Sequence, residues 1–160
     1  MTSLDLLNTD FRDLLQSLCE ERVAFLVVGA YAVAYHGHPR TTGDMDIWVH
    51  ATPDNAGRTW RALARFGAPL QALGVTQQDF ERPDMVVQIG VAPRRIDLLT
   101  GISGVRFADA WTQRVEVPWG GHQVAFLGLE DLLKNKRSTG RAKDSLDAEE
   151  LERRRKAPRT

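Results

Sequence analysis

The sequence predicts an α/β or α+β fold, with a mixed β-sheet of about five strands packed against helices. Helical and strand-like segments alternate over the first half of the chain, and the apolar run at 23–28 is the first strand-like one. Strand-like runs in the second half come in pairs joined by short loops, which favour antiparallel hairpins. A chain in which helices and strands alternate first, and hairpins and two final helices follow, is typical of a mixed sheet covered by helices.

The first elements follow from apolar spacing and from glycines. Residues 5–21 predict an amphipathic helix, whose apolar stripe consists of Leu6, Leu7, Phe11, Leu14, Leu15 and Leu18. Residues 23–28 are too short and too uniformly apolar for a surface helix, so they predict a buried strand. Gly29 ends this strand, and 30–36 predict a short helix that closes at Gly37.

The later elements depend on prolines, caps and β-branched runs. After Pro39 restricts the backbone, 44–50 predict a second strand, and Thr52 caps a helix over 53–66. Residues 67–83 contain two prolines and two glycines and predict no regular element. The remaining predicted elements are strands at 85–89 and 95–99, a short helix at 107–111, strands at 114–117 and 123–126, and helices at 129–136 and 142–154.

Length and charge predict one domain over 1–152, followed by a frayed basic tail at 153–160. Basic and acidic residues number 21 each, so no overall charge favours a nucleic acid, a membrane or an acidic polymer. From Lys134 onward, however, the chain has ten basic residues and only five acidic ones. This end is interpreted either as a solvated helix end and tail or as a basic lip for an RNA or a nucleotide.

Several classes of protein are excluded by what the sequence lacks. Cys19 is the single cysteine, so there is no disulfide framework or thiolate metal site, and the four histidines show no zinc-ligand spacing. The longest apolar stretch, 23–34, is too short to span a bilayer, and the N-terminus has no basic region or cleavage signature. We therefore expect a cytoplasmic protein without zinc or membrane contact.

Asp44 and Asp46 lie two residues apart at the start of the second predicted strand, so their side chains point to one face. Two such carboxylates repel unless a cation lies between them, and a third acid, Asp97, lies on another predicted strand. Mg²⁺ prefers carboxylate oxygens, and two such ions suit nucleotidyl transfer from a triphosphate. We predict that all three acids hold the metal ions and that Asp97 also takes the proton of an attacking hydroxyl.

A phosphate site is predicted immediately before this acid pair. A strand that ends in small residues and opens directly into a helix, as at Gly29 and Ala30, lets backbone N–H groups approach phosphate oxygens. Arg40, Thr41 and Thr42 are predicted to supply a cation and hydroxyls to the same phosphates. The ligand predicted by these residues is a nucleoside triphosphate such as ATP.

The stretch from Phe25 to Val49 resembles the signature of the polymerase β type nucleotidyltransferase superfamily: a strand, a Gly-Gly or Gly-Ser turn, then Asp-x-Asp. Its Ala-x-x-x-His-Gly-x-x-Arg-x-Thr-x-Asp-x-Asp spacing more closely resembles small bacterial nucleotidyltransferases related to abortive-infection and toxin nucleotidyltransferases. Lys136, Gly140-Arg141 and Lys143-Asp144-x-x-Asp147 are similar to the closing helices of that group. Ala30 departs from the pattern, because Ser or a second Gly usually stands there.

This resemblance implies a nucleotidyltransferase-like fold with C-terminal helices, in which Lys136 and Lys143 face the phosphates. It implies transfer of a nucleoside monophosphate to an acceptor hydroxyl, with release of pyrophosphate. The acceptor stays open among a tRNA, a small alcohol and a protein. The alternative hypothesis is a catalytically weak or inactive module that binds a nucleotide or a partner, for example as one half of a toxin–antitoxin pair.

Each candidate residue also has a simpler interpretation. Asp44 and Asp46 fit a turn followed by an exposed strand start, and the face of Asp97 fits a solvent-facing position. Lys136 and Lys143 fit a plain helix surface, where charged residues three or four apart pair with one another. The two sets of interpretations differ in burial and in proximity, which the structure shows directly.

Overall fold

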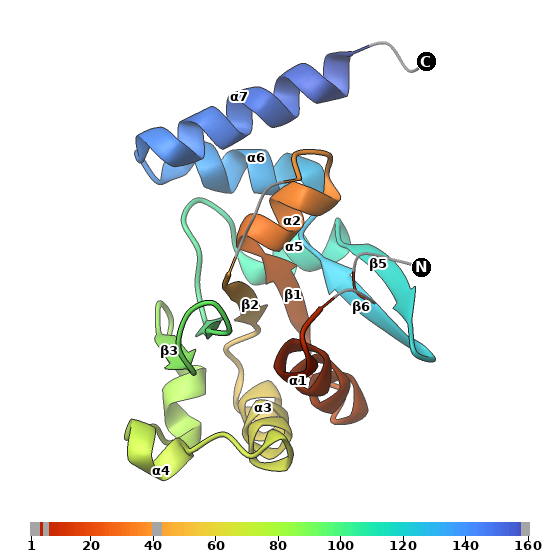
Figure 1. The fold of residues 1–160 in the computed structure, drawn as a ribbon. Coiled ribbons are helices and arrows are strands. Elements are labelled where there is room, and N and C mark those ends of the chain that lie inside the picture. Colours follow the sequence, from red (N-terminus) through yellow and green to blue (C-terminus); the bar gives the residue numbers. More distant parts are fainter. Residues whose placement is uncertain (1–3, 5–6, 40–42, 158–160) are drawn as a thin grey trace.

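The computed structural model describes residues 4, 7–39 and 43–157 of the chain. Six strands form one mixed sheet in the order β3-β4-β2-β1-β6-β5 (Figure 1). The strands are β1 (Phe25–Val28), β2 (Met45–Val49), β3 (Val86–Ile89), β4 (Ile96–Leu99), β5 (Val115–Trp119) and β6 (His122–Phe126). The predicted mixed sheet is confirmed, with six strands where about five were expected.

Helices cover the two ends of this sheet. The helices are α1 (Thr9–Glu20), α2 (Gly29–Tyr35), α3 (Pro53–Phe66), α4 (Leu70–Leu73), the 3-10 helix η2 (Gln77–Glu81), α5 (Phe107–Thr112), α6 (Leu129–Ser138) and α7 (Ala142–Lys156). In Figure 1, α1 and α3 lie side by side at one end of the molecule, and α6 and α7 lie together at the opposite end. The predicted C-terminal helices are therefore present.

Strand β1 is the centre of the core. All four of its residues are buried, and it pairs antiparallel with β2 and parallel with β6. Strand β2 in turn runs parallel to β4. Both predicted hairpins, β3–β4 and β5–β6, are antiparallel as expected from their short loops. A single hydrophobic cluster then runs from Leu4 to Leu151, so the closing helix packs on the same core as the start of the chain.

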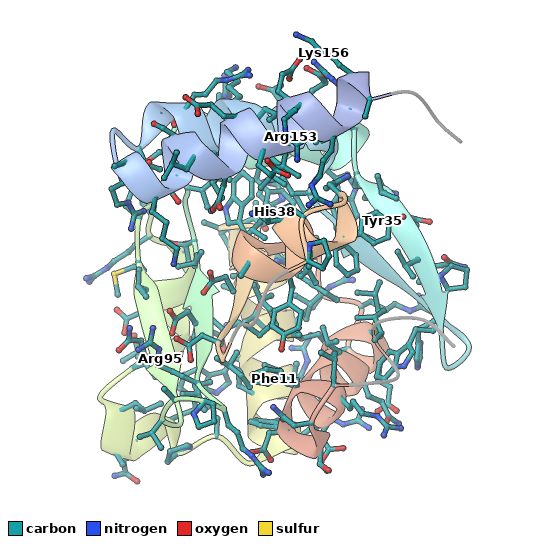
Figure 2. The ribbon with its side chains drawn as sticks, turned by 45° about the horizontal axis from the view of Figure 1, so that its top comes forward. Phe11, Tyr35, His38, Arg95, Arg153 and Lys156 are labelled. Carbon is teal, nitrogen blue, oxygen red and sulfur yellow. The ribbon has the colours of Figure 1, made fainter. Side chains whose placement is uncertain are left out.

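Two segments differ from the sequence prediction. The stretch at 67–83 contains α4 and η2, because a capping box between Thr76 and Asp79 starts a helical turn that buries Phe80 completely. Helix α7 continues to Lys156, so the tail expected from residue 153 begins inside a helix. Figure 2 shows Lys156 at the end of α7, directed away from the rest of the molecule.

Ion pairs within α7 explain why its basic end stays helical. Arg153 and Arg154 both bind Glu150, and Arg155 and Lys156 both bind Glu152, each three or four residues apart. These two acids offset two of the four positive charges, and the four basic residues are exposed, as in a solvated helix end. In the part of the chain that the structure describes, no helix is long and apolar enough to cross a membrane.

Candidate active site

The ends of three neighbouring strands bring the predicted acids together. Asp46 in β2 lies opposite Val28, the last residue of β1, and opposite Asp97 in β4. Because β2 and β4 are parallel, these paired acids direct their side chains to the same face of the sheet. Asp44 immediately precedes β2. Asp97 is only 9 % exposed, so its side chain does not simply face solvent.

Gly29 makes room for the Asp46 carboxylate. It begins α2 directly after β1, with a left-handed φ of 66°. A Cβ atom at this position would lie 2.1 Å from Asp46 Oδ2, far inside contact distance. The turn therefore requires glycine for two reasons. Glycine adopts the left-handed backbone conformation, and its lack of a side chain lets the Asp46 carboxylate lie against the start of the helix.

Gly29→Ala is expected to displace the Asp46 carboxylate and to lower the free energy of unfolding by roughly 1–3 kcal/mol, because backbone strain and steric overlap combine. Gly67→Ala is the matched control. Its φ of 90° is also left-handed, yet a Cβ there would meet nothing within 4 Å. Urea denaturation of both variants measures the difference. Equal losses would mean that the contact with Asp46 adds nothing to backbone strain.

Arg95 supplies a cation that lies between two of the acids. Its Nε lies 2.9 Å from Asp97 Oδ1, and its Nη2 lies 3.2 Å from Asp97 Oδ2. The same Nη2 lies 3.0 Å from Asp44 Oδ2. Arg95 thus forms a forked contact with Asp97 and a bridge to Asp44, the arrangement in which guanidinium–carboxylate pairs are strongest.

Asp46 is a partly buried carboxyl group that lies close to two other acids. Burial, followed by the charges of Asp97 and Asp44, raises the pKa of Asp46 to about 6, although Lys136 and Arg95 act in the opposite direction. This raised pKa means that burial and repulsion from the two neighbouring acids disfavour the charged form of Asp46. An added cation would relieve that repulsion.

Lys136 is enclosed by an acidic network between α6 and α7. Its Nζ lies 3.0 Å from Asp144 Oδ1 and 3.3 Å from Asp147 Oδ2, and the residue is only 7 % exposed. Burial raises the pKa of Asp144, but hydrogen bonds from Thr139 and Lys136 outweigh it, so the pKa is lowered overall. His38, which Figure 2 shows between α2 and α7, has its Nε2 4.0 Å from Asp147 Oδ1. The network holds the closing helices over the strand ends.

These groups line one cleft with two halves. The charged half has a volume of about 380 Å³ and is lined by Gly29, Ala30, Asp44, Asp46, Arg95, Asp97, Lys136, Arg141, Lys143 and Asp144. The second half has a volume of about 330 Å³ and shares Gly29, Asp46, Lys136, Arg141 and Asp144 with the first. Less charged residues complete it: Val28, Asp84, Leu99, Gly101, Ile102, Ser103, Asn135 and Thr139.

The charged half brings together all the predicted site residues that the structure describes, from Gly29 in the turn to Lys143 in α7. The predicted phosphate ligands Arg40, Thr41 and Thr42 lie outside the described residues. Lys136 is buried against acids, which differs from a plain helix surface. Lys143 is exposed at the cleft.

Three residues matter more than their sequence context indicates. Arg95 lies two residues before Asp97, and this spacing on a strand is the signal that both share one face. Asp144 and Asp147 lie three residues apart on α7, and helix surface or capping roles fit that spacing equally well. Their partner, Lys136, belongs to the preceding helix, and only the packing of α6 on α7 identifies it.

The acids have the ligand chemistry of a magnesium site, but their oxygens are not spaced to surround a metal ion. Carboxylate oxygens are the ligands that Mg²⁺ prefers, and Asp44, Asp46 and Asp97 line the same half of the cleft. Within residues 4, 7–39 and 43–157, however, no group of three or more His, Cys, Asp or Glu residues is spaced to hold a metal ion. Arg95 already binds the oxygens of Asp44 and Asp97.

No protein-family model matches this chain, and no curated protein matches its sequence. A solved structure from Thermotoga maritima, described as a "putative nucleotidyltransferase", has a TM-score of 0.57 and 16% sequence identity, with 90% of this chain and 91% of that chain covered. An antigenic nucleotidyltransferase-like protein from Paracoccidioides brasiliensis has a TM-score of 0.47 and 17% identity, with coverages of 86% and 70%. The Thermotoga likeness concerns the fold: the chain has a nucleotidyltransferase-like fold.

Proposed function

We propose that this protein is a Mg²⁺-dependent nucleotidyltransferase that moves a nucleoside monophosphate from a triphosphate to an acceptor hydroxyl and releases pyrophosphate. The observation that carries the proposal is the position of Asp46. It lies opposite Asp97 in the sheet and against the Gly29 turn, in a cleft that Lys136 also lines. The proposed metal-binding acids and the proposed phosphate turn thus line one cavity.

The charge inventory of the charged half supports a triphosphate accompanied by its cations. Four acids (Asp44, Asp46, Asp97 and Asp144) stand against four basic residues (Arg95, Lys136, Arg141 and Lys143). Because these fixed charges balance, a bare triphosphate would enter with a large uncompensated negative charge. A triphosphate with divalent ions brings little net charge and suits the cavity better.

The proposed roles follow from position. Asp44, Asp46 and Asp97 hold the metal ions, and Asp97 accepts the proton of the attacking hydroxyl. When bound, Mg²⁺ supplies neutralisation of the phosphate charge and alignment of the hydroxyl. Gly29 and Ala30 bind phosphate oxygens through backbone N–H groups, and Lys143 contributes a cation from α7. The second half of the cleft receives the acceptor, which is a tRNA end, a small alcohol or a protein side chain.

The test is pyrophosphate release from each of the four ribonucleoside triphosphates with Mg²⁺ and acceptors of the three classes. The Asp44→Asn, Asp46→Asn double variant is expected to fall to the rate without enzyme. A matched double control is Asp10→Asn, Asp13→Asn, which removes the same charge from exposed positions on α1. Turnover by the double variant at the wild-type rate would overturn the proposal.

A second candidate is a module that binds a nucleotide or a partner without turnover, for example within a toxin–antitoxin pair. The bridge between Arg95 and two predicted metal ligands favours it, as does Ala30, which lacks a hydroxyl at the phosphate turn. Calorimetry separates the candidates. Tight triphosphate binding with no Mg²⁺-dependent pyrophosphate release from any acceptor class would select the binding module.

A further inference from the structure

The three contacts of Arg95 use carboxylate oxygens that the proposed metal site also needs. Both oxygens of Asp97 accept from its guanidinium, at 2.9 and 3.2 Å, and Oδ2 of Asp44 lies 3.0 Å from Nη2. A divalent ion on these acids would lie next to a guanidinium held in the same place. Because like charges at such separations repel strongly at a partly buried site, the two occupants oppose each other.

We propose that Arg95 is the built-in counter-ion of the acid site, and that a divalent cation binds by displacing its guanidinium from Asp44 and Asp97. This inference rests on the proposed function, because it concerns the metal ions that this function requires. It explains why the acids lie together yet are not spaced around a metal ion in the described part of the chain.

The side chain of Arg95 can leave while its backbone stays in place. Arg95, which is labelled in Figure 2, immediately precedes β4, and its carbonyl accepts a hydrogen bond from the N–H of Met45 at 3.0 Å. This bond holds the residue to β2. The side chain is 34 % exposed and borders the charged half of the cleft, so rotation about its own torsions is sufficient to release the acids.

Displacement also gives Arg95 a second position. The charged half of the cleft already contains Arg141 and Lys143, which face the volume assigned to the triphosphate. A guanidinium released from Asp97 remains next to this volume and adds a forked donor to it. Release also frees Asp97, the proposed base, from the donors that hold both its oxygens.

The test is calorimetric titration of the full chain with Mn²⁺, which binds oxygen sites like those of Mg²⁺. In Arg95→Gln the dissociation constant for Mn²⁺ is expected to fall about tenfold, since a competing cation has been removed. Arg94→Gln is the matched control, because it removes the same charge from the exposed neighbouring residue. Its dissociation constant is expected to stay within about twofold of wild type.

Arg95→Lys separates displacement from simple repulsion. Lysine keeps the positive charge but lacks the fork that binds Asp97 and Asp44 together, so its Mn²⁺ affinity is expected to lie between those of wild type and Arg95→Gln. A direct reading is the NMR signal of the Arg95 Nε–H group. It is expected to shift when Mg²⁺ is added to the wild type and to stay unchanged in Asp44→Asn, Asp46→Asn.

The outcomes distinguish this inference from the proposed function. Mn²⁺ binding of equal strength in wild type and Arg95→Gln, or weaker binding in the variant, overturns the displacement and leaves a metal-dependent enzyme. Wild-type affinity in Arg95→Lys shows that charge alone acts and also overturns displacement. If neither wild type nor Arg95→Gln binds Mn²⁺, the metal site itself is wrong, and both proposals fall.

Discussion

Lys136→Met is expected to lower the free energy of unfolding by about 3–5 kcal/mol, because it leaves two carboxylates buried without their ammonium partner. Asp144 and Asp147 are 8 % and 3 % exposed, and both lie within 3.3 Å of Lys136 Nζ. Methionine fills a similar volume, so lost packing contributes little. Chemical denaturation at neutral pH measures the loss, and melting temperature should fall in parallel.

The control for this prediction lies on the same helix. Lys134 is exposed on α6, two residues before Lys136, so Lys134→Met is expected to change stability by less than about 0.5 kcal/mol. A similar loss in both variants would indicate a general effect on the helix and would contradict the role of the buried network.

Acid pH provides a further check on the Lys136 network. Asp144 has a pKa lowered from its ordinary value of 3.8, so its contribution to stability is present above that value and is lost as the pH falls through the folded pKa. The difference between wild type and Lys136→Met should therefore be complete at neutral pH. It should shrink as the pH falls below about 4 and through the lowered pKa of Asp144, where the charge that Lys136 stabilises is lost.

The sequence predicts the fold well where local rules decide. The uniformly apolar run that becomes β1 has one simple solution, a buried central strand, and the short loops of β3–β4 and β5–β6 leave only antiparallel pairing. It predicts poorly where distant contacts decide. Phe80, which is fully buried in the core, orders a stretch of glycines and prolines that has no regular pattern of its own.

The site shows the same division. Asp44, Asp46 and Gly29 are recognisable because a carboxylate pair and a strand–turn–helix junction carry their chemistry in their spacing. The contact of Arg95 with Asp44 and the partners of Lys136 are not recognisable in this way. A basic residue near an acid in sequence usually faces solvent, and only the parallel pairing of β2 with β4 and the packing of α7 on α6 place these cations against acids.

Asp46→Asn is expected to stabilise the metal-free protein by about 1–3 kcal/mol at pH 8 while abolishing the proposed nucleotidyl transfer. The pKa of Asp46 is raised from 3.8 to about 6, first by burial and then by Asp97 and Asp44. A raised carboxyl pKa means that the folded state binds the proton more tightly than the unfolded state. The wild type therefore loses stability as the pH rises from about 4 to about 6, and the loss is complete above that range.

Asparagine has nearly the same shape and carries no charge, so it avoids this cost and still fits against Gly29. Denaturation in EDTA at pH 4.5 and pH 8 measures the effect: the two proteins should converge at the lower pH and separate at the higher one. Asp54→Asn, on the exposed surface of α3, is the control and should show no such separation. Equal or lower stability of Asp46→Asn at pH 8 would contradict the prediction.

Addition of Mg²⁺ should reverse the order of stability. If the proposed site binds Mg²⁺, the ion should stabilise the wild type by relieving the repulsion between its carboxylates, and Asp46→Asn, which lacks one proposed ligand, should gain less. A carboxylate that lowers stability in the absence of Mg²⁺ and raises it in the presence of Mg²⁺ behaves as a metal ligand. A carboxylate retained for packing alone would not show this change of sign. The sign of the Mg²⁺ effect in this pair of proteins thus separates a metal site from a merely crowded group of acids.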